Sequence, residues 1–268
     1  MNRKKVLENM EQKEYEGDFS AHVCPINYKM MKKVTPEYDY LRRGFFNQLG
    51  SFFARPILDL AGFIFGISCK LTIVGKENLK GLKKGIITSN HINNIDCALI
   101  KKPLFGKRVY YTVGEFNNFK GIAGSALRAA GTLPFSDNTV CMRHLTNAID
   151  TLAKKDNFIV FYTEGSLWWC YEKPRPLQDG AFFYAAKYNL PIIPMFFTFK
   201  NLKQRKDGSY KKKFYLHIMP PIYPDPNNSL KQNMKYLKLE NSNLLTQKYE
   251  SFYNKKLEYT TKKQTLDN

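Results

Sequence analysis

The first residues whose types and spacing suit acid–base chemistry are His91 and Asp96, in the segment SNHINNID that follows the apolar run Gly85–Ser89. A carboxylate beside an imidazole accepts the hydrogen of one ring nitrogen, which fixes the tautomer and stabilises the imidazolium. The other ring nitrogen is then free to take a proton from an alcohol. The spacing therefore predicts activation of a hydroxyl, although an aspartate that caps a helix beside a structural histidine gives the same pattern.

Three further segments follow this pair along the chain. The first, 124–135, is a small-residue helix that contains Arg128, ends at Gly131 and runs into an extended segment. The second, 158–166, is a buried strand that ends in the polar turn Thr163-Glu164-Gly165-Ser166. The third, 190–195, is a strand opened and broken by prolines.

In this order the four segments resemble the 1-acylglycerol-3-phosphate O-acyltransferase family of glycerolipid acyltransferases, over roughly 71–199. That family has a histidine–four residues–aspartate dyad (HX4D motif), a Gly/Arg block, a Phe-Pro-Glu-Gly-Thr-Arg motif and a Val-Pro-Ile-Ile-Pro-like strand. The resemblance implies that His91 and Asp96 are the catalytic general base. It also implies substrate-binding roles for Asn90, Arg128, Glu164, Gly165, Ser166 and Arg175.

The resemblance further implies an O-acyltransferase of phospholipid biosynthesis. An acyl thioester, either acyl-CoA or acyl-carrier protein, donates the fatty acyl group directly to a lyso-lipid hydroxyl. The expected acceptor is 1-acylglycerol-3-phosphate, which gives phosphatidic acid. No covalent acyl-enzyme, metal or cofactor is expected.

Several basic residues of the family pattern are missing from this chain. Leu167 stands at the position of the motif's arginine, and two other basic positions fall near Asp137-Asn138 and Gln178-Asp179. Leucine cannot replace a bidentate arginine at a phosphate. Arg175 either takes over that role or is a solvated loop charge. Alternatively, the acceptor is a lyso-glycolipid or another lipid alcohol.

The paired Trp168 and Trp169 follow directly after Leu167. Adjacent indoles suit a sugar-bearing lyso-lipid or an anchor at the membrane interface. They also suit simple packing beneath the loop, and the sequence leaves these readings open.

Short apolar runs alternate with helical patterns between about residues 70 and 221. We expect strands at 70–75, 85–89, 108–113, 158–162, 191–199 and 214–219, and helices at 95–102, 122–130, 139–154 and 179–188. This alternation predicts an α/β fold with a mainly parallel central sheet flanked by helices. We divide the chain into an N-terminal arm with membrane-interface helices (1–69), an α/β acyltransferase domain (70–225) and a basic amphipathic C-terminal helix and tail (226–268).

The most apolar stretch, 44–68, is rich in Phe, Leu and Ile but contains Arg55, Pro56 and Asp59. Charges at the centre of a spanning helix cost about 2.5–3.5 kcal/mol each. We therefore expect one or two helices that lie in the membrane interface, with a helix buried in the protein core as the alternative. The C-terminal helix either packs on the domain or helps to bind the membrane.

The net charge of +19 favours a polyanionic partner, and charge alone does not separate an anionic membrane from nucleic acid. The basic residues are spread over the N-terminal arm, the segment 204–213 and the tail. This distribution favours a membrane surface, and no nucleic acid is expected. A non-catalytic basic module that binds membranes or RNA is the second hypothesis, but it leaves the four segments unexplained.

The five cysteines are scattered and contain no CxxC pair, so neither a disulfide framework nor a zinc site is expected. His22, His144 and His217 lack partners at metal-ligand spacing and are interpreted as surface or core residues. Reduced cysteines and a basic surface together indicate a peripheral protein at the cytoplasmic face of a membrane.

Overall fold

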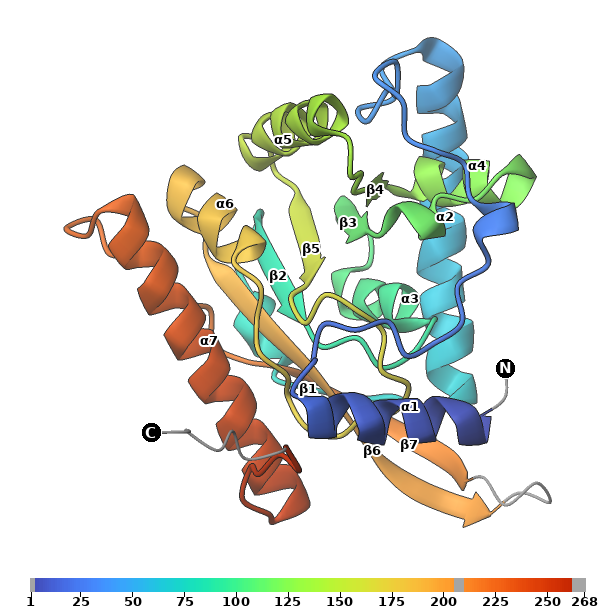
Figure 1. The fold of residues 1–268 in the computed structure, drawn as a ribbon. Coiled ribbons are helices and arrows are strands. Elements are labelled where there is room, and N and C mark those ends of the chain that lie inside the picture. The colour runs from blue at the N-terminus through green and yellow to red at the C-terminus, as the bar shows by residue number, and fades with distance from the viewer. Residues whose placement is uncertain (1–2, 205–209, 262–268) are drawn as a thin grey trace, which may run out of the picture.

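The computed structural model describes residues 3–204 and 210–261 (Figure 1). A seven-stranded sheet in the order β1-β7-β6-β2-β5-β3-β4 forms its centre. The strands are β1 (Thr72–Val74), β2 (Gly85–Ser89), β3 (Val109–Val113), β4 (Thr132–Pro134), β5 (Phe158–Tyr162), β6 (Ile192–Gln204) and β7 (Tyr210–Ile218). The helices are α1 (Arg3–Glu16), α2 (Phe45–Ser68), α3 (Asp96–Lys101), α4 (Gly121–Ala130), α5 (Thr139–Ala153), α6 (Gly180–Tyr188) and α7 (Leu230–Tyr253), with short 3₁₀ turns at Tyr28–Met30, Lys76–Leu79, Lys102–Leu104 and Glu115–Asn117.

The five strands β6, β2, β5, β3 and β4 run parallel, whereas β7 is antiparallel to β6 and β1 is parallel to β7. The expected α/β fold with a mainly parallel sheet is therefore confirmed. In the register of the central pair, Ser89 of β2 lies opposite Tyr162 of β5. Because both strands end there, the segments that follow them, with His91 and Glu164, leave the sheet side by side.

Side chains alternate between two cores, one on each face of the sheet. Ile86, Ile159 and Phe196 point toward the face covered by α5, α6 and α7. Their neighbours Ile87 and Val160 point toward the face covered by α3. Strands buried on both faces are continuous apolar runs, which explains why the sequence showed runs rather than alternation.

The apolar stretch 44–68 forms one helix, α2, with Pro56 inside it. Small residues lie on its buried side: a Cβ on Gly62 would be 2.6 Å from the carbonyl oxygen of Ala98 in α3, so only glycine allows this approach. Asp59 is 8% exposed, and its carboxylate lies 2.7 Å from the ammonium of Lys101. Arg55 donates to the hydroxyl of Tyr110 at 3.0 Å. The two charges that argue against a spanning helix are therefore paired with the domain.

The opposite side of α2 consists of large apolar residues in contact with solvent. Phe46, Phe52 and Ile67 are 84%, 70% and 74% exposed. By length and composition α2 would suffice to cross a membrane, but only 17% of its most apolar window is buried in the protein. This helix therefore presents an apolar face to solvent.

Three segments add detail to the expectations. In the basic segment 204–213, Gln204 ends β6 and residues 210–213 lie on β7, which pairs antiparallel with β6; residues 205–209 lie outside the described part. The C-terminal helix α7 packs on the sheet through Leu237, Leu245 and Tyr249, and the end of the tail, 262–268, lies outside the described residues. Helix α1 was not expected.

Candidate active site

The His91–Asp96 pair lies where β2 ends and α3 begins. The Nδ1 atom of His91 is 3.0 Å from one carboxylate oxygen of Asp96. The same oxygen accepts the backbone N–H groups of Ile92 at 2.8 Å and Asn93 at 2.9 Å. Asp96 is 0% exposed. Three donors thus converge on one buried oxygen, which fixes the carboxylate rigidly.

This geometry determines which nitrogen of His91 is available. A carboxylate only accepts hydrogen bonds, so the imidazole hydrogen lies on Nδ1 and Nε2 keeps its lone pair. The His91 side chain is 19% exposed. The ring stacks on Tyr162 with 4.1 Å between centroids and 23° between planes. One nitrogen is therefore oriented by Asp96, the ring is held by Tyr162, and the other nitrogen is a base.

The Glu164–Arg175 pair lies beside the dyad, at the end of β5. The Glu164 carboxylate accepts the backbone N–H of Arg175 at 2.9 Å and the guanidinium Nε at 3.0 Å, and Nη2 lies 2.9 Å away. It also accepts the backbone N–H of His91. Burial raises the pKa of the Glu164 carboxyl above its ordinary value, and the positive charge of Arg175 opposes this rise.

Arg175 uses its remaining donors on the same turn. Its Nη1 donates to the carbonyl oxygen of Phe19 at 2.7 Å and to the Ser166 hydroxyl at 3.0 Å, and its Nη2 to the Ser166 carbonyl oxygen. All three guanidinium nitrogens donate to protein atoms, in four hydrogen bonds, and Nη2 also lies 2.9 Å from the Glu164 carboxylate. With a side chain 0% exposed, Arg175 is not the solvated loop charge allowed by the sequence. In this conformation it also offers no donor to a substrate phosphate.

The loop after β5 holds the backbone of the dyad segment. Trp168 N–H donates to the carbonyl oxygen of His91 at 3.0 Å, and Cys170 N–H donates to that of Ile92 at 2.9 Å. Gly165 makes the turn possible, since its φ of +83° is in the left-handed region. The Glu-Gly turn therefore contacts the dyad through the main chain.

Trp168 packs beneath this loop. Of the three interpretations that the sequence left open, the structure therefore supports packing for this residue. It is 0% exposed, and its indole N–H donates to the carbonyl oxygen of Ala21 at 2.9 Å. The Arg175 guanidinium lies 4.7 Å above its ring. Trp169 is half-buried beneath the guanidinium of Arg3.

Asn90 and Ser166 also make protein contacts. The Asn90 amide donates to the carbonyl oxygen of Phe197 at 2.9 Å and accepts its N–H at 2.8 Å, which ties β2 to β6 just before His91. The Ser166 hydroxyl donates to the carbonyl oxygen of Ala21 at 2.8 Å. Both side chains are buried, so they position the site in this conformation.

Arg128 lies on α4, and its contacts are local. Its guanidinium donates to the Asn118 side chain at 3.0 Å, the Phe119 carbonyl oxygen at 2.7 Å and the Ser125 hydroxyl at 2.9 Å. Helix α4 crosses α2 beyond the β3–β4 edge of the sheet (Figure 1). The structure thus brings Glu164, Gly165, Ser166 and Arg175 together around the dyad and holds Arg128 in a separate network.

Two contributors to the site carried little signal in the sequence. Tyr162, which stacks on His91, was only the last residue of an apolar strand. Helix α1 packs on Trp168 through Val6 and Met10, and its few apolar residues gave no helical periodicity. Among residues 3–204 and 210–261, no group of three or more His, Cys, Asp or Glu side chains is arranged to hold a metal ion.

The family profile named Acyltransferase matches residues 70–198, which contain the dyad, the Glu164–Arg175 pair and the parallel strands. Residues 70–198 therefore form an acyltransferase domain. The protein is an O-acyltransferase enzyme, which rules out the second hypothesis of a non-catalytic basic module.

One solved structure similar to this acyltransferase is the 1-acyl-sn-glycerophosphate (LPA) acyltransferase PlsC from Thermotoga maritima. The two chains share 17% sequence identity with a TM-score of 0.56, over 82% of this chain and 87% of that chain. At this identity the likeness shows the fold. No curated protein matches the sequence significantly.

Proposed function

We propose that this acyltransferase moves a fatty acyl group from an acyl thioester to a hydroxyl of a lyso-glycerolipid, with His91 as general base and 1-acylglycerol-3-phosphate as acceptor. The observation that carries this proposal is the buried carboxylate of Asp96, 3.0 Å from Nδ1 of a half-buried His91, inside the family domain. The acceptor is suggested by the substrate in the name of the PlsC relative.

The reaction needs one proton to move twice. Nε2 of His91 takes the hydroxyl proton as the alcohol oxygen attacks the thioester carbonyl carbon. The resulting imidazolium is stabilised by the negative charge of Asp96. The tetrahedral intermediate then collapses, the carbon–sulfur bond breaks, and the imidazolium returns its proton to the leaving thiolate. A positioned base of this kind contributes about 10²–10⁴-fold to the rate.

The cysteines nearest the dyad support direct transfer. Burial raises the pKa of the Cys97 thiol to about 11 and that of Cys170 to about 12. A thiol acts as a nucleophile through its thiolate. Both groups are therefore protonated at neutral pH, which disfavours an acyl-cysteine intermediate, and the proposed chemistry uses no metal or cofactor.

A phosphate head group on the acceptor requires a cationic side chain, and Arg175 is already paired with Glu164. Lys212 on β7 is half-buried, lies 4.1 Å above the Phe199 ring and donates to Asn201 at 2.8 Å. In the strand pairing Lys212 lies opposite Asn201 of β6, four residues beyond Phe197, whose backbone binds the Asn90 side chain just before His91. We propose Lys212 as the residue that binds the acceptor phosphate, in place of Arg175.

A panel of acceptors tests this assignment. The purified protein is incubated with one labelled acyl thioester, as CoA and as carrier-protein conjugate, and with lysophosphatidate, a neutral monoacylglycerol and a lyso-glycolipid. We expect the highest kcat/KM for lysophosphatidate, with Lys212→Gln raising KM for that acceptor alone. Faster transfer to the lyso-glycolipid would refute the phosphate assignment while leaving acyl transfer intact.

A different lipid alcohol as acceptor is the second candidate. It is favoured by one observation: Leu167 occupies the family's arginine position, and the guanidinium groups of Arg175 and Arg128 are engaged within the protein. The same panel decides between the two acceptors.

We also propose that α2 places the enzyme on the cytoplasmic face of an anionic membrane, lying in the interface plane. Its inward side is tied to the domain by the Asp59–Lys101 pair, while its outward side exposes Phe52 and Phe53, which are 70% and 60% exposed. Burying one such side chain contributes about 1.5–3 kcal/mol.

Vesicle flotation tests this orientation. The double variant Phe52→Ser with Phe53→Ser should weaken binding to phosphatidylglycerol vesicles at least tenfold. A loss of about 1.4 kcal/mol in binding free energy already corresponds to a tenfold loss in affinity. Tyr236→Ser with Leu239→Ser removes two exposed apolar side chains of α7 and serves as the control, with binding unchanged. Equal binding of both double variants would contradict the proposed face.

A further inference from the structure

The loop 166–175 holds the dyad segment, and it is itself held by segments outside the domain that the family profile matches. The N–H groups of Trp168 and Cys170 donate to carbonyl oxygens of the dyad segment. The loop in turn contacts residues 14–21 of the N-terminal arm and Tyr259 of the tail. Both ends of the chain therefore meet at the loop that positions His91.

Glu14 of α1 joins three segments of the chain. It is 7% exposed, and its carboxylate accepts the Tyr171 hydroxyl at 2.9 Å, the Thr260 backbone N–H at 2.8 Å and the Lys173 ammonium. Burial raises the pKa of the Glu14 carboxyl, but the hydrogen bonds from these partners outweigh it and lower the pKa below its ordinary value. An ionised carboxylate is therefore the shared acceptor for α1, the loop and the tail.

Tyr171 connects Glu14 to the residue that contacts His91. Its ring packs edge-on against the Trp168 indole, with 4.9 Å between centroids and 72° between planes. The indole N–H donates to the carbonyl oxygen of Ala21 at 2.9 Å, so the N-terminal arm also holds Trp168 directly. The Trp168 backbone N–H lies 3.0 Å from the carbonyl oxygen of His91. A continuous series of contacts thus runs from Glu14 to the main chain of His91.

The tail reaches the same loop from the other end of the chain. After α7, Asn254 adopts a left-handed conformation with a φ of +53°. The chain then folds back, and the Glu250 carboxylate accepts the Leu257 N–H at 3.0 Å. The Tyr259 hydroxyl donates to the carbonyl oxygen of Pro174. The tail is therefore fixed both to the end of α7 and to the loop.

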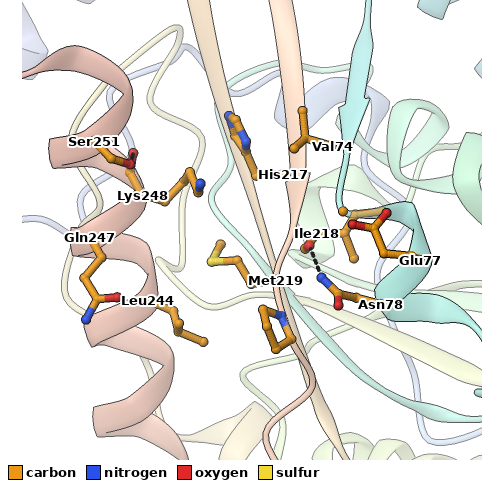
Figure 2. A pocket seen from close by; sticks show the side chains of 12 residues that line it. Val74, Glu77, Asn78, His217, Ile218, Met219, Leu244, Gln247, Lys248 and Ser251 are labelled. Atoms are coloured by element: carbon orange, nitrogen blue, oxygen red, sulfur yellow. Dashed lines mark hydrogen bonds between the residues drawn. The ribbon is translucent and has the colours of Figure 1, made fainter.

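The last turns of α7 are not closely packed on the sheet along their whole length. Figure 2 shows Leu244 and Lys248 of α7 across a cavity of about 470 Å³ from His217 of β7. Beyond this cavity, the Tyr253 hydroxyl accepts the N–H of Phe199 on β6 at 3.1 Å. The end of the helix, where the tail begins, is thus anchored separately from the stretch that lines the cavity.

We propose that α1 and the segment 257–260, together called the terminal clamp, position the active-site loop through Glu14, and that the acyl-transfer site is complete only when both ends of the chain are docked. This inference rests on the proposed role of His91 as general base. Glu14 is a positioning residue that acts through Tyr171 and Trp168. A misplacement of about 1 Å in a catalytic group can cost about 10²-fold in rate.

Hydrogen exchange in the full chain tests the clamp without any enzyme activity. In Glu14→Ala, the N–H groups of Trp168 and Cys170 should exchange about tenfold faster or more, while those of β2 and β5 keep wild-type exchange and report an intact fold. The chain has two tryptophans, both in this loop, so acrylamide should also quench their fluorescence more strongly. Wild-type exchange and quenching in Glu14→Ala overturn the proposal.

Two further variants separate the clamp from a general loss of stability. Tyr171→Phe removes only the hydroxyl that donates to Glu14 and keeps the ring against Trp168, so it should reproduce the faster exchange even if Glu14→Ala does not fold. Glu11→Ala removes an exposed carboxylate one turn earlier on α1 and should match the wild type. Equal exchange in Tyr171→Phe and Glu11→Ala would contradict the proposed contact.

Steady-state kinetics test whether the clamp positions the base. In Glu14→Ala, kcat per folded molecule should fall about 10–100-fold with KM for both substrates unchanged, because the base moves while the binding groups stay. Glu14→Gln keeps an acceptor oxygen and should recover part of the rate. A wild-type kcat, or a change in KM alone, overturns the positioning role. No transfer by the wild type would refute the proposed function instead, and hydrogen exchange would still decide on the clamp.

Discussion

Two charged pairs lie side by side at the carboxyl ends of the central strands β2 and β5. They differ in whether a side-chain nitrogen remains available to a substrate. In the His91–Asp96 pair the carboxylate is 0% exposed, while the imidazole is 19% exposed with Nε2 unused by Asp96. In the Glu164–Arg175 pair the side chains are 2% and 0% exposed, and each of the three guanidinium nitrogens donates to an acceptor in the protein. The first pair can exchange a proton with a substrate, whereas the side chains of the second pair form their hydrogen bonds with other protein groups.

Glu164, Ser166 and Arg175, which the sequence resemblance assigned to substrate binding, make contacts within the protein instead. Glu164 accepts the backbone N–H of His91, and Trp168, three residues past Gly165, donates to the carbonyl oxygen of His91. The Glu-Gly turn therefore positions the main chain on which His91 stands. We interpret Glu164, Ser166 and Arg175 as positioning residues, and His91 and Asp96 as the catalytic pair.

The largest effect on the rate within this comparison is expected from Asp96→Asn. The amide oxygen can keep the hydrogen bonds of Ile92 and Asn93, so the fold and the ring orientation persist. The negative charge that stabilises the imidazolium is lost, and kcat should fall by about 10²–10⁴-fold. Steady-state transfer to a lyso-lipid measures this. An unchanged kcat would remove Asp96 from the mechanism.

Arg175→Met should instead reduce stability. It leaves the Glu164 carboxylate buried without its cation, and breaking a buried pair in this way costs about 3–5 kcal/mol. Urea denaturation gives the change in the free energy of unfolding.

The control for that measurement removes both charges. Glu164→Leu combined with Arg175→Met should recover much of the lost stability, because no isolated charge remains. The rate per folded molecule should fall less in Arg175→Met than in Asp96→Asn. The reverse order of rates would show that Arg175 contacts the substrate.

The smallest effect is expected from Ser166→Ala. It removes a hydroxyl that donates to Ala21 and accepts from Arg175, and a single hydrogen bond contributes about 0.5–1.5 kcal/mol. The free energy of unfolding should drop by about that amount, with the rate per folded molecule unchanged. A selective rise in KM for the acceptor would return Ser166 to the substrate-binding set.

The sequence predicted the parts of this molecule that depend on local patterns. Buried runs such as 158–162 identified the central strands, and the spacing of His91 and Asp96 placed both on one strand-to-helix turn. The sequence also indicated that 44–68 is helical, and the structure pairs its Asp59 with Lys101 and its Arg55 with Tyr110.

What the sequence missed depends on contacts between distant residues. Arg175 pairs with Glu164, 11 positions away, across a loop whose course no periodicity reveals. Helix α1 contributes only Val6 and Met10 to an apolar cluster that is completed by Trp168. The stacking of Tyr162 on His91 follows from the register of β2 with β5, which becomes known only when the strands are paired.

The most direct test of the central claim compares two acceptors in His91→Ala. An alcohol needs a base to become a nucleophile, whereas a thiol, with a pKa of about 8.5, needs much less help. With the natural hydroxyl acceptor we predict a loss in kcat of about 10²–10⁴-fold. With the same lyso-lipid carrying a thiol at that position, the variant should approach the wild-type rate. An equal loss with both acceptors would show that His91 does not act as the base.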